Sequence, residues 1–165
     1  MFTSDQKGAH EAVKLGIEVY KPVMDGSRCD FILADADCRL IRAQCKWARR
    51  VGDVIAVRCY SSRRSASGFV KRPYTPSEVD ALVAYCPELD RCYYLPLENF
   101  PGRVQIQLRL ARAKNNQRSG IHWAEDYELA ARLCRPGAVA QLGERVTGSH
   151  EVRGSIPLGS IDSSA

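Results

Sequence analysis

The sequence predicts one mixed α+β domain in which helices flank a central, mixed β-sheet. Alternating apolar and polar residues over 104–110 are typical of a strand with one buried face, and helix start and stop signals lie near both ends of the folded part. A length of 165 residues, with 45% hydrophobic and 26% charged residues, is enough for one sizeable core. The sequence has no apolar run of about 18 residues, so no contact with a membrane is expected.

The N-terminal part is predicted to form one helix and four strands. Apolar spacing followed by a glycine stop signal indicates a helix over 7–15, and alternation indicates a strand over 17–20. The compact apolar run over 29–33 and the run over 40–47 are joined by an Asp-rich turn and predict a β-hairpin. The segment 53–59 is rich in β-formers and is predicted to be a further strand.

The prediction from residue 61 onward begins with a loop. The segment 61–73 is polar, basic and contains Gly and Ser, as loops do. Thr75, Pro76 and Glu78 are typical of a capped helix start. The apolar residues Val79, Leu82 and Val83 then favour a helix, and Pro87 lies just past its end. The remaining predicted elements are strands over 91–95 and 104–110 and a helix over 123–133.

The spacing of the seven cysteines argues against a zinc site and against a disulfide framework. Their number is odd, no two of them form a CxxC pair, and the three histidines complete no ligand set. Because no secretory signal is visible, we expect reduced, buried thiols and a cytoplasmic location. The cysteines are residues 29, 38, 45, 59, 86, 92 and 134.

Positive charge is concentrated in one segment. Nine of the 24 Lys and Arg residues lie between Arg42 and Arg72, where Asp53 is the one acidic residue. Such a local excess favours a polyanionic partner, with a solvated basic loop as the alternative. The nine residues are Arg42, Lys46, Arg49, Arg50, Arg58, Arg63, Arg64, Lys71 and Arg72.

The predicted hairpin carries the residues with the clearest chemical meaning. Gln44 and Lys46 are two apart on one strand and project from the same face, whereas Cys45 and Trp47 face the core. Asp30 opens the preceding strand and can lie beside Gln44 and Lys46. A carboxylate, an amide oxygen and an ammonium group are costly to leave beside a core unless something binds there. A surface lysine beside a hydrogen-bonded glutamine is the alternative interpretation.

Each residue type in this hairpin has a task in phosphodiester hydrolysis. Asp30 is expected to anchor a divalent cation by its charge, and Mg²⁺ would suit this site because it prefers oxygen ligands. The side chain of Gln44 and the main-chain carbonyl of Cys45 add neutral oxygen ligands. Lys46 orients or deprotonates the attacking water and offsets charge on the phosphorus.

Further short motifs extend the pattern along the chain. They include Lys7-Gly8-Ala9, Leu15-Gly16-Ile17, Tyr20-Lys21-Pro22-Val23, Cys29-Asp30-Phe31-Ile32, Arg42-Ala43-Gln44-Cys45-Lys46-Trp47-Ala48, Arg72-Pro73-Tyr74-Thr75 and Trp123-Ala124-Glu125-Asp126. In this order they resemble the PD-(D/E)xK endonuclease family associated with group I introns. The resemblance covers roughly residues 7 to 130, and the combination is far more specific than any single motif.

The resemblance implies a restriction-endonuclease-like core and a nuclease that cleaves double-stranded DNA. It implies Mg²⁺ as cofactor, with Mn²⁺ as a substitute, and the catalytic set Asp30, Gln44, Lys46 and Glu11. Glu11 enters because the family places a glutamate on the first helix. The implied metal ligands are Asp30, Gln44, Cys45 and Glu11, and DNA phosphates are expected to contact Arg49, Arg50, Arg58, Arg63, Arg64, Lys71 and Arg72.

The sequence changes character after residue 135. The segment 136–165 is rich in Gly and Ser and has no core pattern, so a disordered tail is predicted to follow a nuclease domain over 1–135. Two segments of this tail resemble the translation of a tRNA gene. They are Val139-Ala140-Gln141-Leu142-Gly143-Glu144-Arg145 and Arg153-Gly154-Ser155-Ile156-Pro157. We interpret this tail as a product of read-through into such a gene, or the reading frame as a mobile remnant beside one.

The function predicted from these observations is a metal-dependent DNA endonuclease of the homing or mobile-element type. A monomer of 165 residues has limited surface for DNA, so a homodimer or homotetramer is expected. Two alternatives stay open. The predicted first helix is shorter than the family's, which favours a catalytically impaired DNA-binding protein; a structure-specific repair or junction nuclease is the other.

Overall fold

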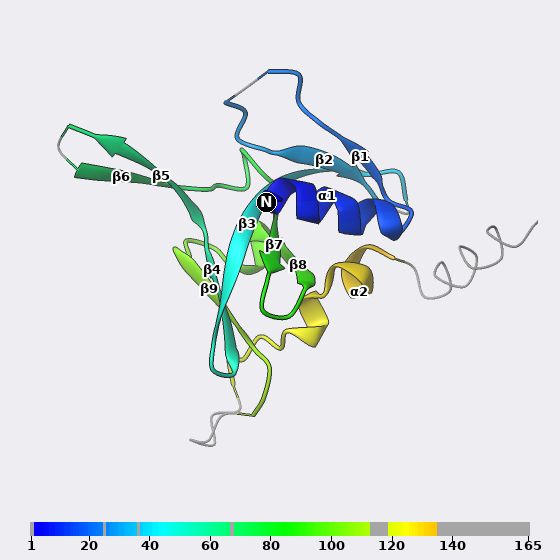
Figure 1. Ribbon diagram of the computed structural model, residues 1–165, viewed down its shortest axis with the longest axis vertical. Helices are drawn as coiled ribbons and strands as arrows, with labels where there is room; N and C mark the ends of the chain where they lie inside the picture. The colour runs from blue at the N-terminus through cyan, green and yellow to red at the C-terminus, as the bar shows by residue number, and fades with distance from the viewer. Residues whose placement is uncertain (1, 25, 36, 67, 113–118, 135–165) are drawn as a thin grey trace, which may run out of the picture.

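A mixed sheet and a separate two-stranded hairpin organise the chain (Figure 1). The computed structural model describes residues 2–24, 26–35, 37–66, 68–112 and 119–134. Over these residues helices pack on both faces of the sheet, which confirms the α+β prediction. The predicted tail over 136–165 lies outside the described residues.

The helices and strands follow one another as helix, strands and short helices. The elements are α1 (Ser4–Lys14), β1 (Glu18–Tyr20), β2 (Phe31–Ala34), β3 (Leu40–Val51), β4 (Val54–Arg58), β5 (Tyr60–Ser65), β6 (Gly68–Pro73), β7 (Ala81–Cys86), β8 (Arg91–Pro96), the 3₁₀ helix η1 (Leu97–Asn99), β9 (Gln105–Arg109), the 3₁₀ helix η2 (Glu125–Tyr127) and α2 (Leu129–Leu133).

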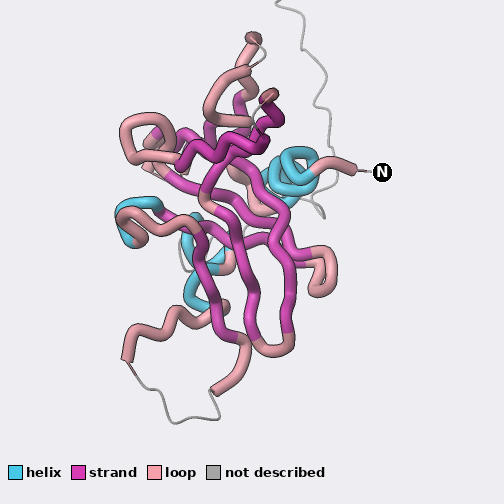
Figure 2. Tube along the Cα trace, turned by 90° about the vertical axis from the view of Figure 1, so that its left-hand side faces the viewer, coloured by secondary structure: helices cyan, strands magenta, loops and turns pink. Residues whose placement is uncertain are grey.

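Strand β3 connects all parts of the sheet because its 12 residues pair with three neighbours. Residues 40–43 pair antiparallel with β2, residues 43–47 pair parallel with β7, and residues 48–51 pair antiparallel with β4. Strand β9 continues the sheet beyond β4, and β8 continues it beyond β7. In Figure 2 the part formed by β3, β4 and β9 faces the viewer, and no described helix lies in front of it.

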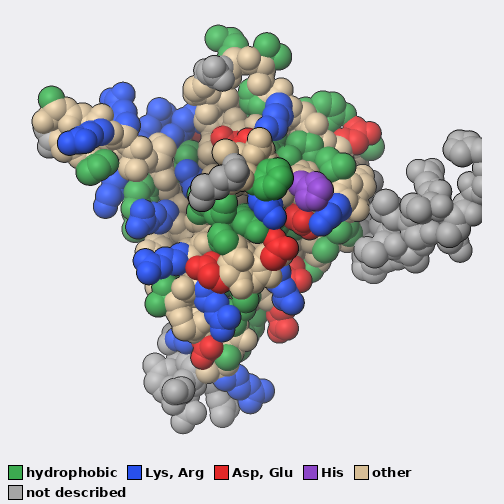
Figure 3. Space-filling model, in the orientation of Figure 1, with side chains coloured by type: hydrophobic (Ala, Val, Ile, Leu, Met, Phe, Trp, Pro, Cys, Tyr) green, Lys and Arg blue, Asp and Glu red, His purple; other side chains and the backbone are tan. Residues whose placement is uncertain are grey.

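The segment 61–73 is a β-hairpin, so the prediction of a loop was wrong. Strands β5 and β6 pair antiparallel over six residue pairs, and the hairpin projects from the body as an arm (Figures 1 and 3). Both strands are largely exposed on both faces, so the sequence shows none of the apolar alternation that marks a half-buried strand. Gly68 has a φ of +118°, which supports the tight connection between the two strands.

The predicted helix that begins at Thr75 is also absent. Thr75 and Glu78 form a turn, in which the Glu78 N–H donates to the carbonyl of Thr75. The chain then enters β7, whose six residues are all buried. A central strand buried on both faces is apolar throughout, so its periodicity cannot be distinguished from that of a buried helix. The predicted helix over 123–133 is shortened to η2 and α2.

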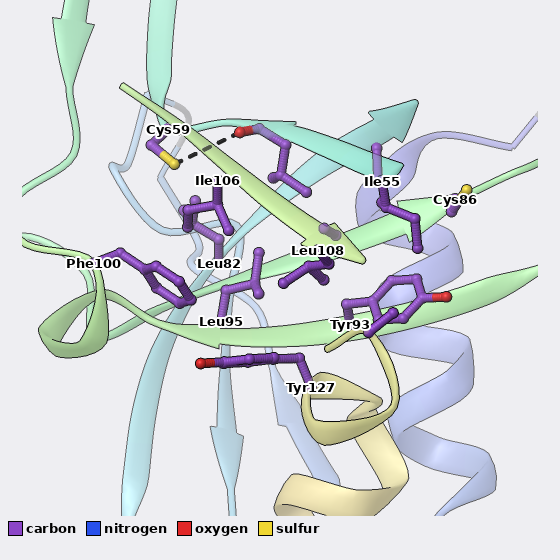
Figure 4. Close-up of a cluster of buried hydrophobic side chains, with 14 of the residues drawn as sticks. Ile55, Cys59, Leu82, Cys86, Tyr93, Leu95, Phe100, Ile106, Leu108 and Tyr127 are labelled. Carbon is purple, nitrogen blue, oxygen red and sulfur yellow. Dashed lines mark hydrogen bonds between the residues drawn. The ribbon is translucent and has the colours of Figure 1, made fainter. Parts of the chain in front are cut away.

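Two hydrophobic cores lie on opposite sides of the sheet. One contains Tyr93, Leu95, Ile106 and Leu108 of the sheet, together with Tyr127 of η2 (Figure 4). The other lies between α1 and the sheet and contains Ala12, Phe31, Leu33, Cys45 and Val83. Strand β3 therefore carries buried residues on both faces, which fixes the position of its polar residues.

Helix α1 begins earlier than the sequence prediction placed it. Thr3 caps the helix, and the Gln6 side chain bonds back to the Thr3 N–H in a capping box. The helix therefore has 11 residues from Ser4 onward, against the predicted start at residue 7. The predicted start at residue 7 was therefore wrong, while the alternative of a catalytically impaired protein stays a prediction.

Gly8 allows α1 to approach the sheet closely. A Cβ atom at this position would lie 3.1 Å from Val83 Cγ1, 3.2 Å from Cys45 Sγ and 3.3 Å from Phe31 Cζ. All three atoms belong to buried side chains of the core beneath α1. The contact fixes α1 directly above Cys45, next to the polar residues of β3.

We expect Gly8→Ala to lower the free energy of unfolding by about 1 kcal/mol. Alanine gains about 1 kcal/mol of helix propensity over glycine. Overpacking a dense core costs about 1–3 kcal/mol, however, and here three neighbours must move together. Urea unfolding measures the difference, with His10→Ala at an exposed position of α1 as the control. A more stable Gly8→Ala variant would contradict the close contact.

Candidate active site

Along one edge of β3 the paired strand changes from β2 to β4, and the two paired strands leave a gap between them. This gap, beside residues 44–47, is the fork. Residues 40–43 pair with β2 and residues 48–51 with β4, so among the described strands none pairs with 44–47 on this edge. Strand β7 covers the opposite edge. Main-chain groups alternate in direction along a strand, so the N–H and C=O of Cys45 point into the fork. Asp30, just before β2, lies at this point.

The carboxylate of Asp30 accepts two hydrogen bonds from β3 inside the fork. The main-chain N–H of Cys45 donates to Oδ2 at 2.7 Å, and Gln44 Nε2 donates to the same oxygen at 2.5 Å. Gln44 is only 9% exposed, and its amide also lies 3.4 Å from the carbonyl of Cys45. The predicted approach of Asp30 to Gln44 is therefore present.

Burial raises the pKa of Asp30 above its ordinary value. The hydrogen bonds from Cys45 and Gln44 and the charge of Lys46 lower this pKa, while the charge of Asp5 raises it. The net direction is upward, so the protein groups do not fully compensate the ionised carboxylate. A cation bound beside Asp30 would supply the missing compensation.

Lys46 lies on the same face of β3 as Gln44 and is held by a tyrosine. Its Nζ donates to the Tyr74 hydroxyl at 2.7 Å and lies 4.6 Å from the centre of the ring. The guanidinium of Arg28 lies 4.2 Å from the centre of the same ring. Arg28 also bonds to Ser61 and forms an ion pair with Glu78, so one network connects Lys46 to the base of the arm.

We expect Tyr74→Phe to slow DNA cleavage about tenfold without weakening DNA binding, because the hydroxyl fixes Lys46 Nζ and small displacements are costly in catalysis. Single-turnover rates at saturating protein separate the chemical step from binding. Tyr20→Phe, which removes an exposed hydroxyl bonded to Glu18, is the matched control. A wild-type rate in Tyr74→Phe would show that the hydrogen bond has no positioning role.

Glu11 is not brought to the fork. Its carboxylate pairs with Lys14 at 2.9 Å, and it lines a surface cleft with Cys92 and Glu128. The α1 acid whose charge acts on Asp30 is Asp5, which pairs with Lys21 at 3.1 Å. The capping-box pattern from Thr3 to Gln6 was the signal that could have placed Asp5 in the first turn.

The structure separates the two residues predicted to face the core. Cys45 is buried beneath α1. Trp47 is 47% exposed and contacts Tyr85 edge to face, with ring centres 5.5 Å apart, so its assignment to the core was wrong. All seven cysteines are free, but only Cys45, Cys59, Cys86 and Cys92 are buried, and Cys38 is exposed, so the prediction of buried thiols was wrong for Cys38. Burial raises the pKa of the Cys59 thiol to about 11, as in an unreactive thiol.

The basic residues predicted to contact DNA divide into two groups. Arg63, Arg64, Lys71 and Arg72 lie on the arm, and blue side chains gather on the arm and on the side of the molecule next to it in Figure 3. Arg72 pairs with Glu78 at the base of the arm. Arg49, Arg50 and Arg58 lie on β3 and β4 and are exposed.

The donor atoms in the fork fit a hard divalent cation. Among the described residues, no three His, Cys, Asp or Glu side chains cluster as a metal-binding group. A cation in the fork would therefore depend on Asp30, the amide of Gln44 and the carbonyl of Cys45. All are oxygen donors once the Gln44 amide presents its Oε1, which suits Mg²⁺ and not zinc. We find that the residues present fit such an ion.

A mixed sheet that forks around a carboxylate, an amide and a lysine defines the class of restriction-endonuclease-like nucleases. The chain belongs to the PD-(D/E)XK endonuclease family, whose sequence profile matches residues 3–130. It is therefore a nuclease, the substrate that the family implies is DNA, and nucleases of this family generally use divalent metal ions.

A solved structure shares the fold. The chain is similar to the bacterial homing endonuclease I-Ssp6803I, with a TM-score of 0.59 and 24% sequence identity over 88% of this chain and 94% of the other. Among curated proteins, none matches the chain significantly. No helix of the described residues is long and apolar enough to cross a membrane.

Proposed function

We propose that the protein is a Mg²⁺-dependent endonuclease that cleaves double-stranded DNA and belongs to the homing or mobile-element type. The observation that carries the proposal is the fork, where Asp30 bonds to Gln44 and Cys45 while Lys46 extends from the same strand. Asp30, Gln44 and the carbonyl of Cys45 would hold the cation. When bound, a divalent cation polarises the scissile phosphate and makes water a better nucleophile.

Lys46 has two tasks in this proposal. Its ammonium group offsets negative charge that develops on the phosphate, and it orients the attacking water. The hydrogen bond to Tyr74 limits the positions that Nζ can adopt, so the group is preorganised before DNA binds. Mn²⁺ is expected to replace Mg²⁺, because it accepts the same oxygen donors.

The arm and the exposed arginines supply the charge that binds DNA. Arg63, Arg64 and Lys71 project from β5 and β6 and are exposed. Contacts from these residues to phosphates release counterions, so binding falls steeply as salt rises. Phosphate contacts position the duplex and do not read its sequence.

The likeness to a homing endonuclease supports the homing type. Because Glu11 pairs with Lys14 away from the fork, a catalytically impaired DNA-binding protein stays the alternative. A repair or junction nuclease would use the same fork for catalysis and would differ in the DNA structure that it cleaves. A homodimer or homotetramer would place two forks on the two strands of one site. The assembly and the cytoplasmic location stay predictions, as does the limit of the nuclease domain at residue 135.

Nicking of a supercoiled plasmid tests the proposed function. We expect wild-type protein to convert the plasmid to open-circular and linear forms in Mg²⁺ or Mn²⁺ and to leave it intact in EDTA. Retention of labelled duplex in Ca²⁺, measured over a salt series, reports binding separately. Binding without nicking in either metal would support the impaired alternative, and nicking in EDTA would contradict the metal dependence.

Substitutions of the two α1 carboxylates, Asp5 and Glu11, show which of them influences metal binding in the fork. We expect Asp5→Asn to raise the Mg²⁺ concentration needed for half-maximal nicking, because the charge that acts on Asp30 is lost. Glu11→Gln is the matched variant and is expected to leave the Mg²⁺ requirement unchanged, since Glu11 pairs with Lys14 instead. If Glu11→Gln raises the Mg²⁺ requirement and Asp5→Asn does not, then Glu11 and not Asp5 acts at the site.

A further inference from the structure

One face of the sheet formed by β3, β4 and β9 is uncovered by the rest of the described chain (Figure 2). The opposite face carries Ile55, Val57, Ile106 and Leu108, which are buried. The strand register places the uncovered side chains in three cross-strand rows. This open face consists of Trp47, Arg58 and Gln105, then Arg49, Ala56 and Gln107, then Val51, Val54 and Arg109.

The composition of the open face fits a polyanion. Three of its nine residues are arginines, none is acidic, and none is fully buried. Gln105 and Gln107 are exposed, and their side chains bond to no other described residue. Arg58 lies directly opposite Gln105 in the register of β4 and β9. The face therefore presents unused amide and guanidinium groups toward solvent.

The spacing of these groups matches the steps of a DNA duplex. Gln105 and Gln107 are two residues apart on one strand, which is about 6.8 Å at 3.4 Å per residue. Base pairs rise by about 3.4 Å, so the two amides meet alternate base pairs. Strands β4 and β9 form a two-stranded ribbon, which is an element that the major groove of about 12 Å admits. Arg49, one strand further on, is in place to meet a flanking phosphate.

The chemistry of the side chains fits base recognition as well. A glutamine amide pairs bidentately with the N6 and N7 edge of adenine, and arginine pairs with guanine. The open face also begins at Trp47, the residue after Lys46 on β3. Side chains of neighbouring residues on a strand point to opposite faces, so the open face adjoins the fork along β3 without sharing the face of Lys46.

We propose that the open face enters the major groove of the bound duplex and that Gln105 and Gln107 determine sequence specificity there. The inference rests on the proposed nuclease function, because it names the part of the substrate that the enzyme reads. The arm then acts mainly on phosphates, while the open face discriminates among bases.

Sequence selection from a pool of duplexes with a randomised segment tests this inference. Wild-type protein in Ca²⁺ is expected to enrich a motif. The double variant Gln105→Ala, Gln107→Ala is expected to retain DNA with an unchanged salt dependence but to lose about tenfold discrimination or more at two positions of that motif. Asn99→Ala, an exposed amide on η1, is the control and should enrich the wild-type motif. Thermal unfolding shows whether each variant is folded.

The outcomes separate this inference from the proposed function. If the double variant enriches the same motif as the wild type, or if the wild type retains DNA without any motif, the reading by the open face is wrong and the nuclease proposal stands. If the wild type neither retains nor cleaves DNA, the proposed function itself fails. A change in oligomeric state on light scattering, with an unchanged motif, would assign the open face to a second copy of this chain instead.

Discussion

Replacing Lys46 with alanine is expected to reduce DNA cleavage by about a thousandfold, in line with the loss of a positioned proton donor or acceptor and of an electrostatic contact to the phosphate. Lys46 is the cation of the fork, and its Nζ is already fixed by Tyr74 at 2.7 Å. No other described lysine or arginine bonds to Tyr74 OH in its place. Single-turnover cleavage of a plasmid in Mg²⁺ measures the loss.

Binding should survive the same substitution. The arm and the open face carry six of the seven basic residues predicted to contact DNA, so we expect Lys46→Ala to retain duplex in Ca²⁺ within a fewfold of the wild type. Lys14→Ala removes an exposed lysine of α1 that pairs with Glu11, and it is the matched control for both assays. Equal cleavage by Lys46→Ala and wild type would remove Lys46 from the catalytic set.

The second large effect is expected from Asp30→Asn, which should abolish cleavage and raise the stability of the metal-free protein at neutral pH. The asparagine keeps an oxygen that accepts from the Cys45 N–H and the Gln44 amide. It removes the buried negative charge whose burial raises the pKa of Asp30. Loss of that charge removes the anchor for the cation and, in the same step, the cost of burying the charge.

The pH dependence of stability has a defined sign. Because the pKa of Asp30 is higher in the folded chain than in the unfolded chain, the folded state binds more protons between these two values. The contribution of Asp30 to the free energy of unfolding is fully present below the pKa of the unfolded chain, about 3.9. It is lost as pH rises through the pKa of the folded chain. The stability gained in Asp30→Asn should therefore grow over the same pH window and then stay constant.

Urea unfolding in EDTA at several pH values measures this gain, and nicking in Mg²⁺ measures the loss of activity. The matched variant is Asp90→Asn, because hydrogen bonds from Tyr85 and the charge of Lys7 lower the pKa of Asp90. It should lose stability at neutral pH, which is the opposite sign. If Asp30→Asn unfolds at a lower urea concentration than the wild type, the ionised carboxylate stabilises the folded chain, and the expected cost of its burial is contradicted.

The sequence predicted most strands of the sheet from alternation, from compact apolar runs or from a high content of β-forming residues. The run from Val104 to Leu110 contains β9, and the paired runs over 29–33 and 40–47 overlap β2 and the first part of β3, which continues to Val51. Prediction failed where alternation was absent for physical reasons. The arm has no buried face, and β7 has no exposed one, so neither shows a period of two residues.

The candidate site was predictable to the extent that it depends on one hairpin. Gln44 and Lys46 share a face of β3 because they are two residues apart, and the turn brings Asp30 beside them. Contacts from distant segments were not predictable. The role of Tyr74 depends on the path of the arm, and the choice of Asp5 over Glu11 depends on the rotation of α1, which the packing of Gly8 sets.

The placement of a metal ion tests the central claim most directly. Crystals of the protein soaked in Mn²⁺ give an anomalous signal that locates the ion without reference to activity. We predict a peak in coordinating contact with the carboxylate of Asp30 and the carbonyl of Cys45, and its loss in Asp30→Asn. An ion bound elsewhere, with the space beside Asp30 empty at saturating Mn²⁺, would contradict the assignment of this fork as the active site.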